Sequence, residues 1–261
     1  MSWLDWDATL TTAAAPSDID GTMRLVDITN DLAPTGALRV SINLGNPVLA
    51  QGTPDAPAGV TVDIARELGA RLCIPVELIC FDAARDSFEA MTAGRADIGF
   101  LAVDPARQKT VAFTAPYAVI EGVFAVRDDS PLTSAADVDR AGVRVGVKKG
   151  SAYDLFLTRT LAHAEVVRGS EGTAVFAEQQ LEVAAGIRQP VADFVAAHTG
   201  TRLLEPRFME IQQAVGTPRS RSEESIGFLH TFVEELKADG FIAGALARSG
   251  RGDATVAPPA A

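Results

Sequence analysis

A glycine-flanked turn contains the first group of residues in this sequence that could do chemistry. The segment Gly146-Val147-Lys148-Lys149-Gly150-Ser151 ends a predicted strand, and Ser151 and Asp154 form a capping box that opens the following helix. The free backbone N–H groups of such a turn, the Ser151 hydroxyl and the positive end of the helix point to one spot. The turn predicts an anion site at Gly150 and Ser151, although an ordinary capped helix would show the same pattern.

Arg107 is the second candidate for anion binding. Asp104-Pro105 is a strong helix-start signal, with an Asp N-cap and a Pro at the first helical position, so Arg107 stands in the first turn of a predicted helix. An arginine there can hold a carboxylate with two parallel hydrogen bonds, although a solvated arginine is the usual case.

The common catalytic signatures are absent from the sequence. It has no G-x-S-x-G, G-x-x-x-x-G-K-[ST], S-x-x-K or H-E-x-x-H motif, and its 3 histidines lie far apart. We therefore expect no metal, no cofactor and no cysteine nucleophile. Cys73 and Cys80 are predicted to be buried free thiols at the ends of a helix and a strand, with a disulfide as the alternative.

These candidate residues lie in a chain that alternates strand and helix signals, the pattern of an α/β protein. One α/β unit is predicted over about 36–125 and a second over about 126–210, followed by an amphipathic helix over 222–237. Residues 1–35 are predicted to be an extension that is partly ordered at best, and residues 250–261 a flexible tail.

The composition excludes two classes of partner. The chain has 34 Asp and Glu against 23 Lys and Arg, a net charge of -11, and no basic patch, so we expect no nucleic-acid binding. No apolar run reaches the roughly 18 residues needed to cross a bilayer, so we expect no membrane insertion. The first residues carry neither a basic region nor an apolar stretch, which predicts a cytoplasmic protein unless the native start is longer.

A series of short motifs along the chain resembles one known family. In order they are Leu38-Arg39-Val40, Gly59-Val60-Thr61-Val62-Asp63-Ile64-Ala65, Gly94-Arg95-Ala96-Asp97-Ile98, Asp104-Pro105-Ala106-Arg107, Phe113-Thr114-Ala115-Pro116-Tyr117, Val145-Gly146-Val147-Lys148-Lys149-Gly150-Ser151 and Leu236-Lys237-Ala238-Asp239-Gly240. From Leu38 to about Arg248 the sequence is similar to the family 3 extracellular solute-binding proteins, which capture polar amino acids for ABC importers.

The resemblance implies the two-lobed type II periplasmic-binding-protein fold, with each lobe a mixed sheet flanked by helices. Lobe 1 would comprise 36–124 and 214–249, and lobe 2 would comprise 125–213, with hinge crossings near 122–127 and 209–215. The family also implies a monomer, an ABC transporter permease as partner, and a periplasmic location. In the family the arginine matching Arg107 grips the ligand carboxylate, helped by the turn that matches Gly150 and Ser151.

The sequence departs from the family pattern at three pocket positions. Ala102 stands where a Thr is usual, and Asn43 replaces an acidic residue of some members. Arg188 stands where an aspartate normally holds the ligand ammonium. A second cleft arginine would favour a ligand with two anionic groups over an amino acid, unless Arg188 turns outward or pairs with Glu121.

Aromatic and amide residues complete the predicted pocket, although the aromatic ones would serve equally as core. They are Phe100, Tyr117, Tyr153, Asn46, Gln189 and Gln212.

Three functions fit this pattern. The first is binding of a small carboxylate-bearing metabolite (an amino acid or a dicarboxylate) in an interlobe cleft, as the substrate-binding component of an ABC importer. The second is a cleft enzyme of the cyclohexadienyl-dehydratase type, for which Glu121 and Glu182 are the candidate acids. The third is a cytoplasmic ligand-sensing module. An acidic residue in the cleft would favour catalysis, whereas cations with amides and aromatics would favour binding.

Overall fold

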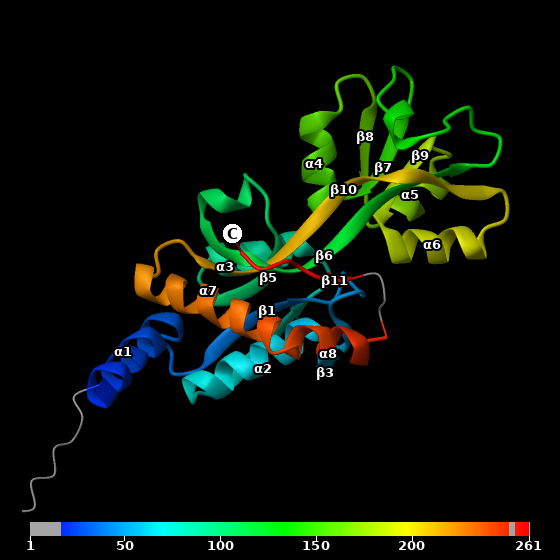
Figure 1. Cartoon of the computed structure of the whole chain (residues 1–261). Helices are drawn as coiled ribbons and strands as arrows, with labels where there is room; N and C mark the ends of the chain where they lie inside the picture. The colour runs from blue at the N-terminus through cyan, green and yellow to red at the C-terminus, as the bar shows by residue number, and fades with distance from the viewer. Residues whose placement is uncertain (1–16, 251–253, 261) are drawn as a thin grey trace, which may run out of the picture.

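The protein consists of two α/β lobes connected by two long strands (Figure 1). The computed structural model describes residues 17–250 and 254–260, and their side chains from residue 24 onward. The sequence predictions for residues 1–16, 251–253 and 261 lie outside the described residues. Within the described part of the chain, no helix is both long and apolar enough to cross a membrane.

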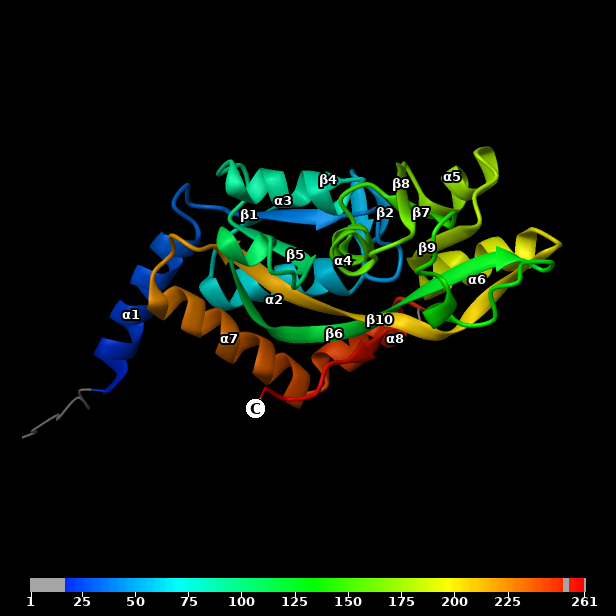
Figure 2. The same cartoon turned by 90° about the horizontal axis from the view of Figure 1, so that it is seen from above.

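Lobe 1 is built on a parallel sheet. Strand β1 (Leu38–Asn43) lies between β4 (Val76–Phe81) and β5 (Ile98–Ala102) and pairs with both in parallel. Helix α2 (Val60–Leu72) and helix α3 (Ala84–Thr92) cover opposite faces of this sheet (Figure 2). A small hairpin of β2 (Gln51–Thr53) and β3 (Ala56–Ala58) precedes α2.

The apolar spacing of α2 shows why this segment is a helix and which side it buries. Val60, Ile64, Leu68 and Leu72 recur every fourth residue, and all four are buried in the core of lobe 1. Complete burial of each such side chain stabilises the fold by about 1.5–3 kcal/mol.

Lobe 2 repeats the arrangement with its own parallel strands. Strand β7 (Arg144–Lys148) lies between β8 (Glu165–Gly169) and β9 (Val183–Ile187). Alternate residues of these strands enter different cores. Val145, Val147 and Val183 share a core with α4 (Ala152–Thr160), whereas Ala184 on the other face packs with residues of α5 (Gly172–Glu178) and α6 (Arg188–Ala197).

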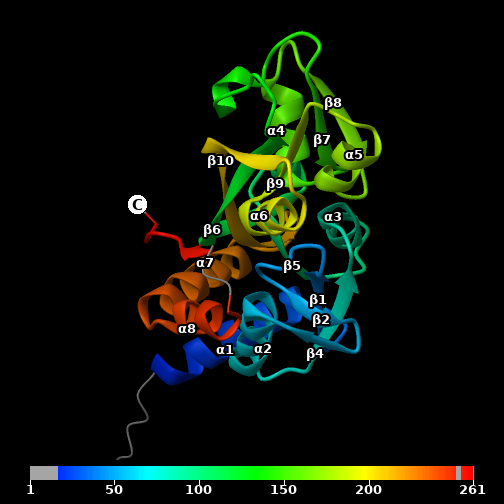
Figure 3. The same ribbon diagram turned by 90° about the vertical axis from the view of Figure 1, so that its right-hand side faces the viewer.

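The lobes share the strands β6 (Val111–Arg127) and β10 (Thr201–Pro218), which run antiparallel to each other along the molecule (Figure 2). The lobe 1 half of β10 pairs with β5 through 213–216, and the lobe 2 half of β6 pairs with β9 through 122–125. The crossing between the lobes therefore falls at 118–121 of β6 and 209–212 of β10, and Figure 3 shows lobe 2 standing above lobe 1 across this connection.

The two ends of the chain differ from the sequence prediction. Residues 17–32 of the predicted extension form helix α1 (Ser17–Leu32), which contacts α7 (Glu223–Ala238) and buries Leu32 completely. In the predicted tail, β11 (Thr255–Val256) pairs with β6 at Val119 and Ala118. Helix α8 (Phe241–Arg248), which packs against α2 and α7, was not predicted either. Cys73 is exposed and Cys80 is half-buried, so the prediction that both are buried is wrong, and both are free thiols.

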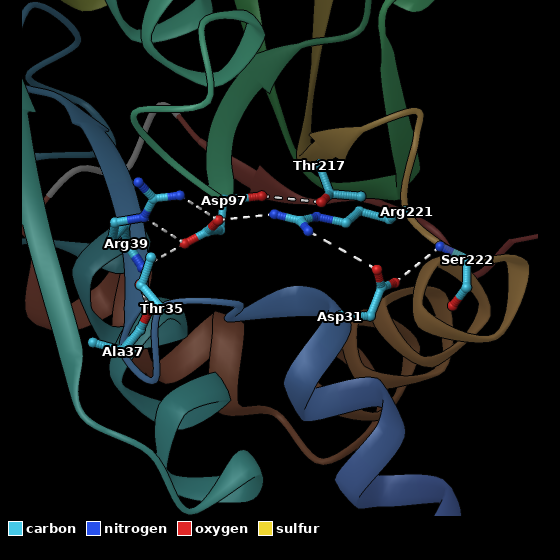
Figure 4. Close-up of polar contacts among 8 residues, drawn as sticks. All are labelled: Asp31, Thr35, Ala37, Arg39, Asp97, Thr217, Arg221 and Ser222. Atoms are coloured by element: carbon cyan, nitrogen blue, oxygen red, sulfur yellow. Dashed lines mark hydrogen bonds and ion pairs between the residues drawn. The ribbon is translucent and has the colours of Figure 1, made fainter.

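A buried carboxylate ties these elements together at the base of lobe 1 (Figure 4). Asp97 has no exposed side-chain surface, and it accepts hydrogen bonds from the Arg39 guanidinium at 2.8 and 2.9 Å and from Arg221 at 2.9 Å. Asp31 of α1 accepts a hydrogen bond from the Ser222 backbone at 2.9 Å. The network joins β1, the start of β5, α1 and the N-terminus of α7.

Candidate ligand-binding site

A cavity with about 50 Å³ of free space lies between the lobes and next to the hinge. Its wall combines the ends of β1 and β5 from lobe 1, the turn after β7 and the start of α4 from lobe 2, and the inward side chains of β10. A site at this place requires both lobes, because each supplies part of its wall.

Arg107 enters the cavity from lobe 1. The Asp104 side chain accepts a hydrogen bond from the Ala106 backbone at 2.8 Å, and the segment that follows is a short 3-10 turn, Arg107–Lys109, rather than the predicted longer helix. The guanidinium donates a hydrogen bond to the Ala102 carbonyl oxygen in lobe 1 and another to the Gly150 carbonyl oxygen in lobe 2, each at 3.1 Å.

The charge of Arg107 has no opposite charge bound to it. The residue is 3% exposed, and none of the described carboxylates forms an ion pair with it. Burial lowers the pKa of Arg107 to about 10, so the guanidinium remains charged at neutral pH. The charge of nearby Asp104 raises the pKa of Arg107 in part, but Asp104 is itself paired with Arg159, and the hydrogen bonds of the guanidinium go only to neutral carbonyls. A bound anion would supply further compensating charge.

The turn after β7 has the predicted form with one difference. Ser151 caps α4 and accepts a hydrogen bond from the Asp154 backbone at 3.0 Å. The Asp154 carboxylate accepts a hydrogen bond from the Gly150 backbone N–H at 2.8 Å, so this N–H group is not free to bind a ligand. Ser151 lines the cavity, whereas Gly150 contributes its carbonyl oxygen to Arg107. Gly150 has a φ of 73°, and a Cβ there would lie 2.8 Å from Arg85, so glycine permits the close approach of the lobes.

Two lysines of this turn extend the positive wall. Lys148 and Lys149 both line the cavity, a role that the sequence prediction did not assign to them. Lys148 forms an ion pair with Glu171, which lines the neighbouring cavities, whereas Lys149 is exposed. None of the described residues that line the main cavity is Asp or Glu. The wall therefore carries a net positive charge.

Amide side chains occupy the rest of the polar wall. Asn43 lines the cavity and uses its Oδ1 to accept the Gly45 backbone N–H at 3.1 Å. Asn46 also lines the cavity, and its buried Oδ1 has no hydrogen-bond partner. The prediction for Gln212 is wrong by one residue. Gln213 faces the cavity and is buried, whereas Gln212 is exposed and points to the opposite side of β10.

The comparisons with known proteins agree with this architecture. Residues 38–248 match the family described as bacterial extracellular solute-binding proteins, family 3. The chain belongs to this family. The residues matched run from the first strand of lobe 1 to the end of α8, so the family assignment includes both lobes and the cavity between them.

Solved structures of amino-acid-binding proteins share the fold. The arginine-binding protein ArgBP from T. maritima, as its P235GK mutant, has a TM-score of 0.69 and 19% identity, covering 85% of this chain and 99% of that chain. AbpA from Streptococcus pneumoniae, an amino acid ABC transporter substrate-binding protein bound to L-arginine, has a TM-score of 0.68 and 18% identity, covering 84% and 96%.

A third similar structure is that of a binding protein described as the precursor of an enzyme. The ancestral amino acid-binding protein AncCDT-1, a precursor of cyclohexadienyl dehydratase, has a TM-score of 0.67 and 18% identity, covering 84% of this chain and 98% of that chain. At these identities the likeness establishes the type II periplasmic-binding-protein fold and leaves the ligand to be argued from the cavity.

Arg188, at the family's ammonium-binding position, does not present a free cation to the cavity. It begins α6, and its guanidinium pairs with Glu121 of β6 and with Glu205, to which it donates at 2.7 and 3.0 Å. These hydrogen bonds to Glu205 and Glu121 raise the pKa of Arg188 above its ordinary value. The prediction of a second cleft arginine is therefore wrong, because two carboxylates outside the cavity hold the side chain.

The neighbouring Gln189 is also directed away from the cavity. Its side-chain amide donates to Asp193 on the next turn of α6 at 2.8 Å, and the residue does not line the cavity. Ile187, the last residue of β9, lines the cavity in place of both. This part of the lobe 2 wall is consequently apolar.

The predicted aromatic residues divide between the cavity and the core. Phe100 and Tyr153 line the cavity, as does Ala102, whose carbonyl oxygen also holds Arg107. Tyr117 is fully buried outside the lining and packs edge-on against Phe100 at 5.9 Å between ring centroids. Burial raises the pKa of the Tyr117 hydroxyl far above its ordinary value. Tyr117 supports Phe100 from behind instead of contacting a ligand.

The lobes contact each other beside the cavity. Arg159 of α4 forms a 2.7 Å ion pair with Asp104 of lobe 1, and Arg107 reaches the Gly150 carbonyl oxygen of lobe 2. These two contacts bridge the lobes close to the proposed anchor, so closure of the cleft and the geometry of Arg107 are coupled.

Proposed function

We propose that this protein binds a small carboxylate anion between its lobes as the substrate-binding component of an ABC importer. The observation that carries the proposal is the buried Arg107 guanidinium, which enters the interlobe cavity without a carboxylate partner among the described residues. The planar fork of arginine matches a carboxylate with two parallel hydrogen bonds.

The position of this anchor links binding to a change of shape. Arg107 belongs to lobe 1 and already contacts Gly150 of lobe 2. A carboxylate held by Arg107 and by Ser151 would join the lobes, so the ligand stabilises the closed arrangement through its contacts with both. A closed form that depends on ligand is the signal that a transporter permease needs.

The alternative of a cleft enzyme requires a carboxylic acid that faces the ligand. Of its candidate acids, Glu121 pairs with Arg188 and Arg207, and Glu182 pairs with Arg144 at 2.9 Å. Neither lines the main cavity. The cationic wall therefore favours binding over acid catalysis.

The proposal is tested with a thermal-shift screen of carboxylic acids, followed by calorimetry on the acids that stabilise the protein. A ligand at 100 times its Kd stabilises the folded state by about 2.7 kcal/mol. Arg107→Met should weaken binding by at least about 30-fold, because truncating one partner of a buried charge pair costs about 2–5 kcal/mol. Arg107→Lys should retain part of the affinity, since it keeps the charge and loses the fork.

Arg95 offers a matched control, because it is an exposed arginine of lobe 1 outside the cavity. Arg95→Met should leave the affinity unchanged. Uptake of the labelled acid by cells should require the wild-type gene and should not be restored by Arg107→Met. Equal binding by wild type and Arg107→Met, or no stabilisation by any carboxylate, would refute the proposal.

A further inference from the structure

Asn46 has an unsatisfied polar group in the cavity wall. The residue is 6% exposed, it lines the cavity, and its buried Oδ1 has no hydrogen-bond partner. Buried amide oxygens without a partner are rare, because losing the hydrogen bond to water costs about 1–3 kcal/mol. A ligand that donates a hydrogen bond at this place would satisfy the oxygen.

The backbone holds Asn46 firmly. Its N–H donates to the Asn43 carbonyl oxygen at 3.2 Å, and its own carbonyl oxygen accepts from Leu49 and Ala50 at 3.1 and 3.0 Å. The turn therefore presents the side chain from a fixed position after β1, and a ligand does not need to order it first. Preorganisation of this kind reduces the entropy lost on binding.

The charges around the cavity decide which donor suits Asn46. Arg107, Lys148 and Lys149 line the wall, and no described carboxylate does. Of the acids in the neighbouring cavities, Glu171 is engaged by Lys148, Asp104 by Arg159 and Glu210 by Arg207. Asp82 lines the adjoining cavity on the far side of Gly45 and not the wall that holds Asn46. An ammonium placed beside Asn46 would meet cations and only neutral acceptors in the wall of this cavity, so its positive charge would be repelled and left without a counterion there. A hydroxyl donates the same hydrogen bond and carries no charge.

We propose that the ligand is a hydroxycarboxylate, with its carboxylate on Arg107 and its hydroxyl donating to Asn46 Oδ1. The inference rests on the proposed function and specifies its substrate class. The carboxylate supplies the negative charge that Arg107 lacks, and the hydroxyl supplies the donor that Asn46 lacks. The apolar wall formed by Phe100, Ile187 and Ile211 accommodates the carbon skeleton.

The test uses matched acids that differ in a single group. Three series are titrated by calorimetry: 2-hydroxy-, 2-amino- and unsubstituted 4-methylpentanoate; the same three forms of pentanedioate; and 3-hydroxy-, 3-amino- and unsubstituted butanoate. In the series that binds most tightly, the hydroxy acid should bind at least about 10-fold more tightly than both relatives.

Two variants of Asn46 assign the preference to this side chain. Asn46→Leu should reduce the advantage of the hydroxy acid over the unsubstituted acid to within about twofold, since the acceptor is gone. Asn46→Asp should raise the affinity of the amino acid relative to the hydroxy acid by about 10-fold, because it supplies a counterion. Gln212→Leu, at an exposed position outside the main cavity, is the control and should change neither ratio.

The outcomes separate the inference from the function beneath it. If the amino member binds as tightly as the hydroxy member and the binding still depends on Arg107, the hydroxycarboxylate inference is wrong and carboxylate binding stands. The inference is also wrong if Asn46→Leu folds with a normal thermal transition and keeps the full hydroxy preference. If none of the nine acids binds to wild type but another carboxylate stabilises it in the screen, the inference is wrong and the proposed function stands; if no carboxylate does, both fail.

Discussion

Removing the charge of Arg107 should weaken ligand binding by at least about 30-fold and leave the ligand-free protein at least as stable as before. Burial places the Arg107 pKa at about 10, against an ordinary value of about 12.5. At about 1.4 kcal/mol for each tenfold change in the ionisation equilibrium, keeping this charge buried costs roughly 3 kcal/mol of folding free energy. Its two hydrogen bonds to carbonyl oxygens stabilise the folded state and offset part of this free energy.

The expected balance follows from these opposing contributions. Two hydrogen bonds of about 1 kcal/mol each offset roughly 2 of the 3 kcal/mol, so Arg107→Met should raise the free energy of unfolding by about 1 kcal/mol. For a chain of this size that gain corresponds to a rise of about 2–4 °C in Tm. The rise in Tm is expected only without ligand, because a bound carboxylate would stabilise the buried charge in the wild type.

The assay compares Tm and denaturant unfolding of wild type and Arg107→Met, with and without the best carboxylate from the screen. The wild type should be stabilised by ligand and the variant should not. Arg95→Met provides the baseline for removing a solvated arginine. A loss of more than about 2 kcal/mol in ligand-free Arg107→Met would refute the reasoning, because it would show that the guanidinium is a structural element of the cavity wall.

Three further predictions concern stability and closure. Asp97→Ala should lower the free energy of unfolding by about 3–5 kcal/mol in urea titrations, since it strands the arginines around a fully buried carboxylate; a loss below about 1 kcal/mol would contradict this. Arg159→Met breaks the interlobe pair and leaves the buried Asp104 carboxylate without its partner, so ligand affinity should fall by at least about fivefold in calorimetry; an unchanged affinity would contradict the coupling of this pair to closure. Hydrogen bonds from the Thr133 side chain and backbone hold the pKa of Asp137 at about 2, below its unfolded value, so its contribution is present above about pH 4 and is lost as pH falls towards 2. Asp137→Asn should flatten the stability profile in that window, and an unchanged profile would count against it.

Local signals in the sequence were sufficient for most of the regular elements. Ser151 and Ser222 cap α4 and α7 as their sequences indicate, because a capping side chain contacts backbone only two or three residues away. The apolar spacing of α2 likewise depends on neighbours within the helix. Arg107 and Ser151 were predicted as site residues from such local patterns, and both line the cavity.

The missed elements depend on contacts between distant parts of the chain. Helix α1 is stabilised by packing on α7, and β11 by pairing with β6, neither of which leaves a strong mark on the local sequence. The same cause explains Gln212: the residue lies on a strand, but which face meets the cavity follows from the pairing of Gln213 with Ala102 across the sheet.

The sequence alone determined the family, most of the regular elements and the placement of Arg107 at the cavity, because those rest on motifs and on periodicity within single segments. The charge of the site was decided by tertiary structure. Arg188 pairs with Glu121 and Glu205, which are 67 and 17 residues away in sequence, so its side chain does not line the cavity. The cations that line the lobe 2 wall are Lys148 and Lys149. Electrostatic partners are chosen by distance in space, and Coulomb energies change too steeply with that distance to be deduced from the order of residues along the chain.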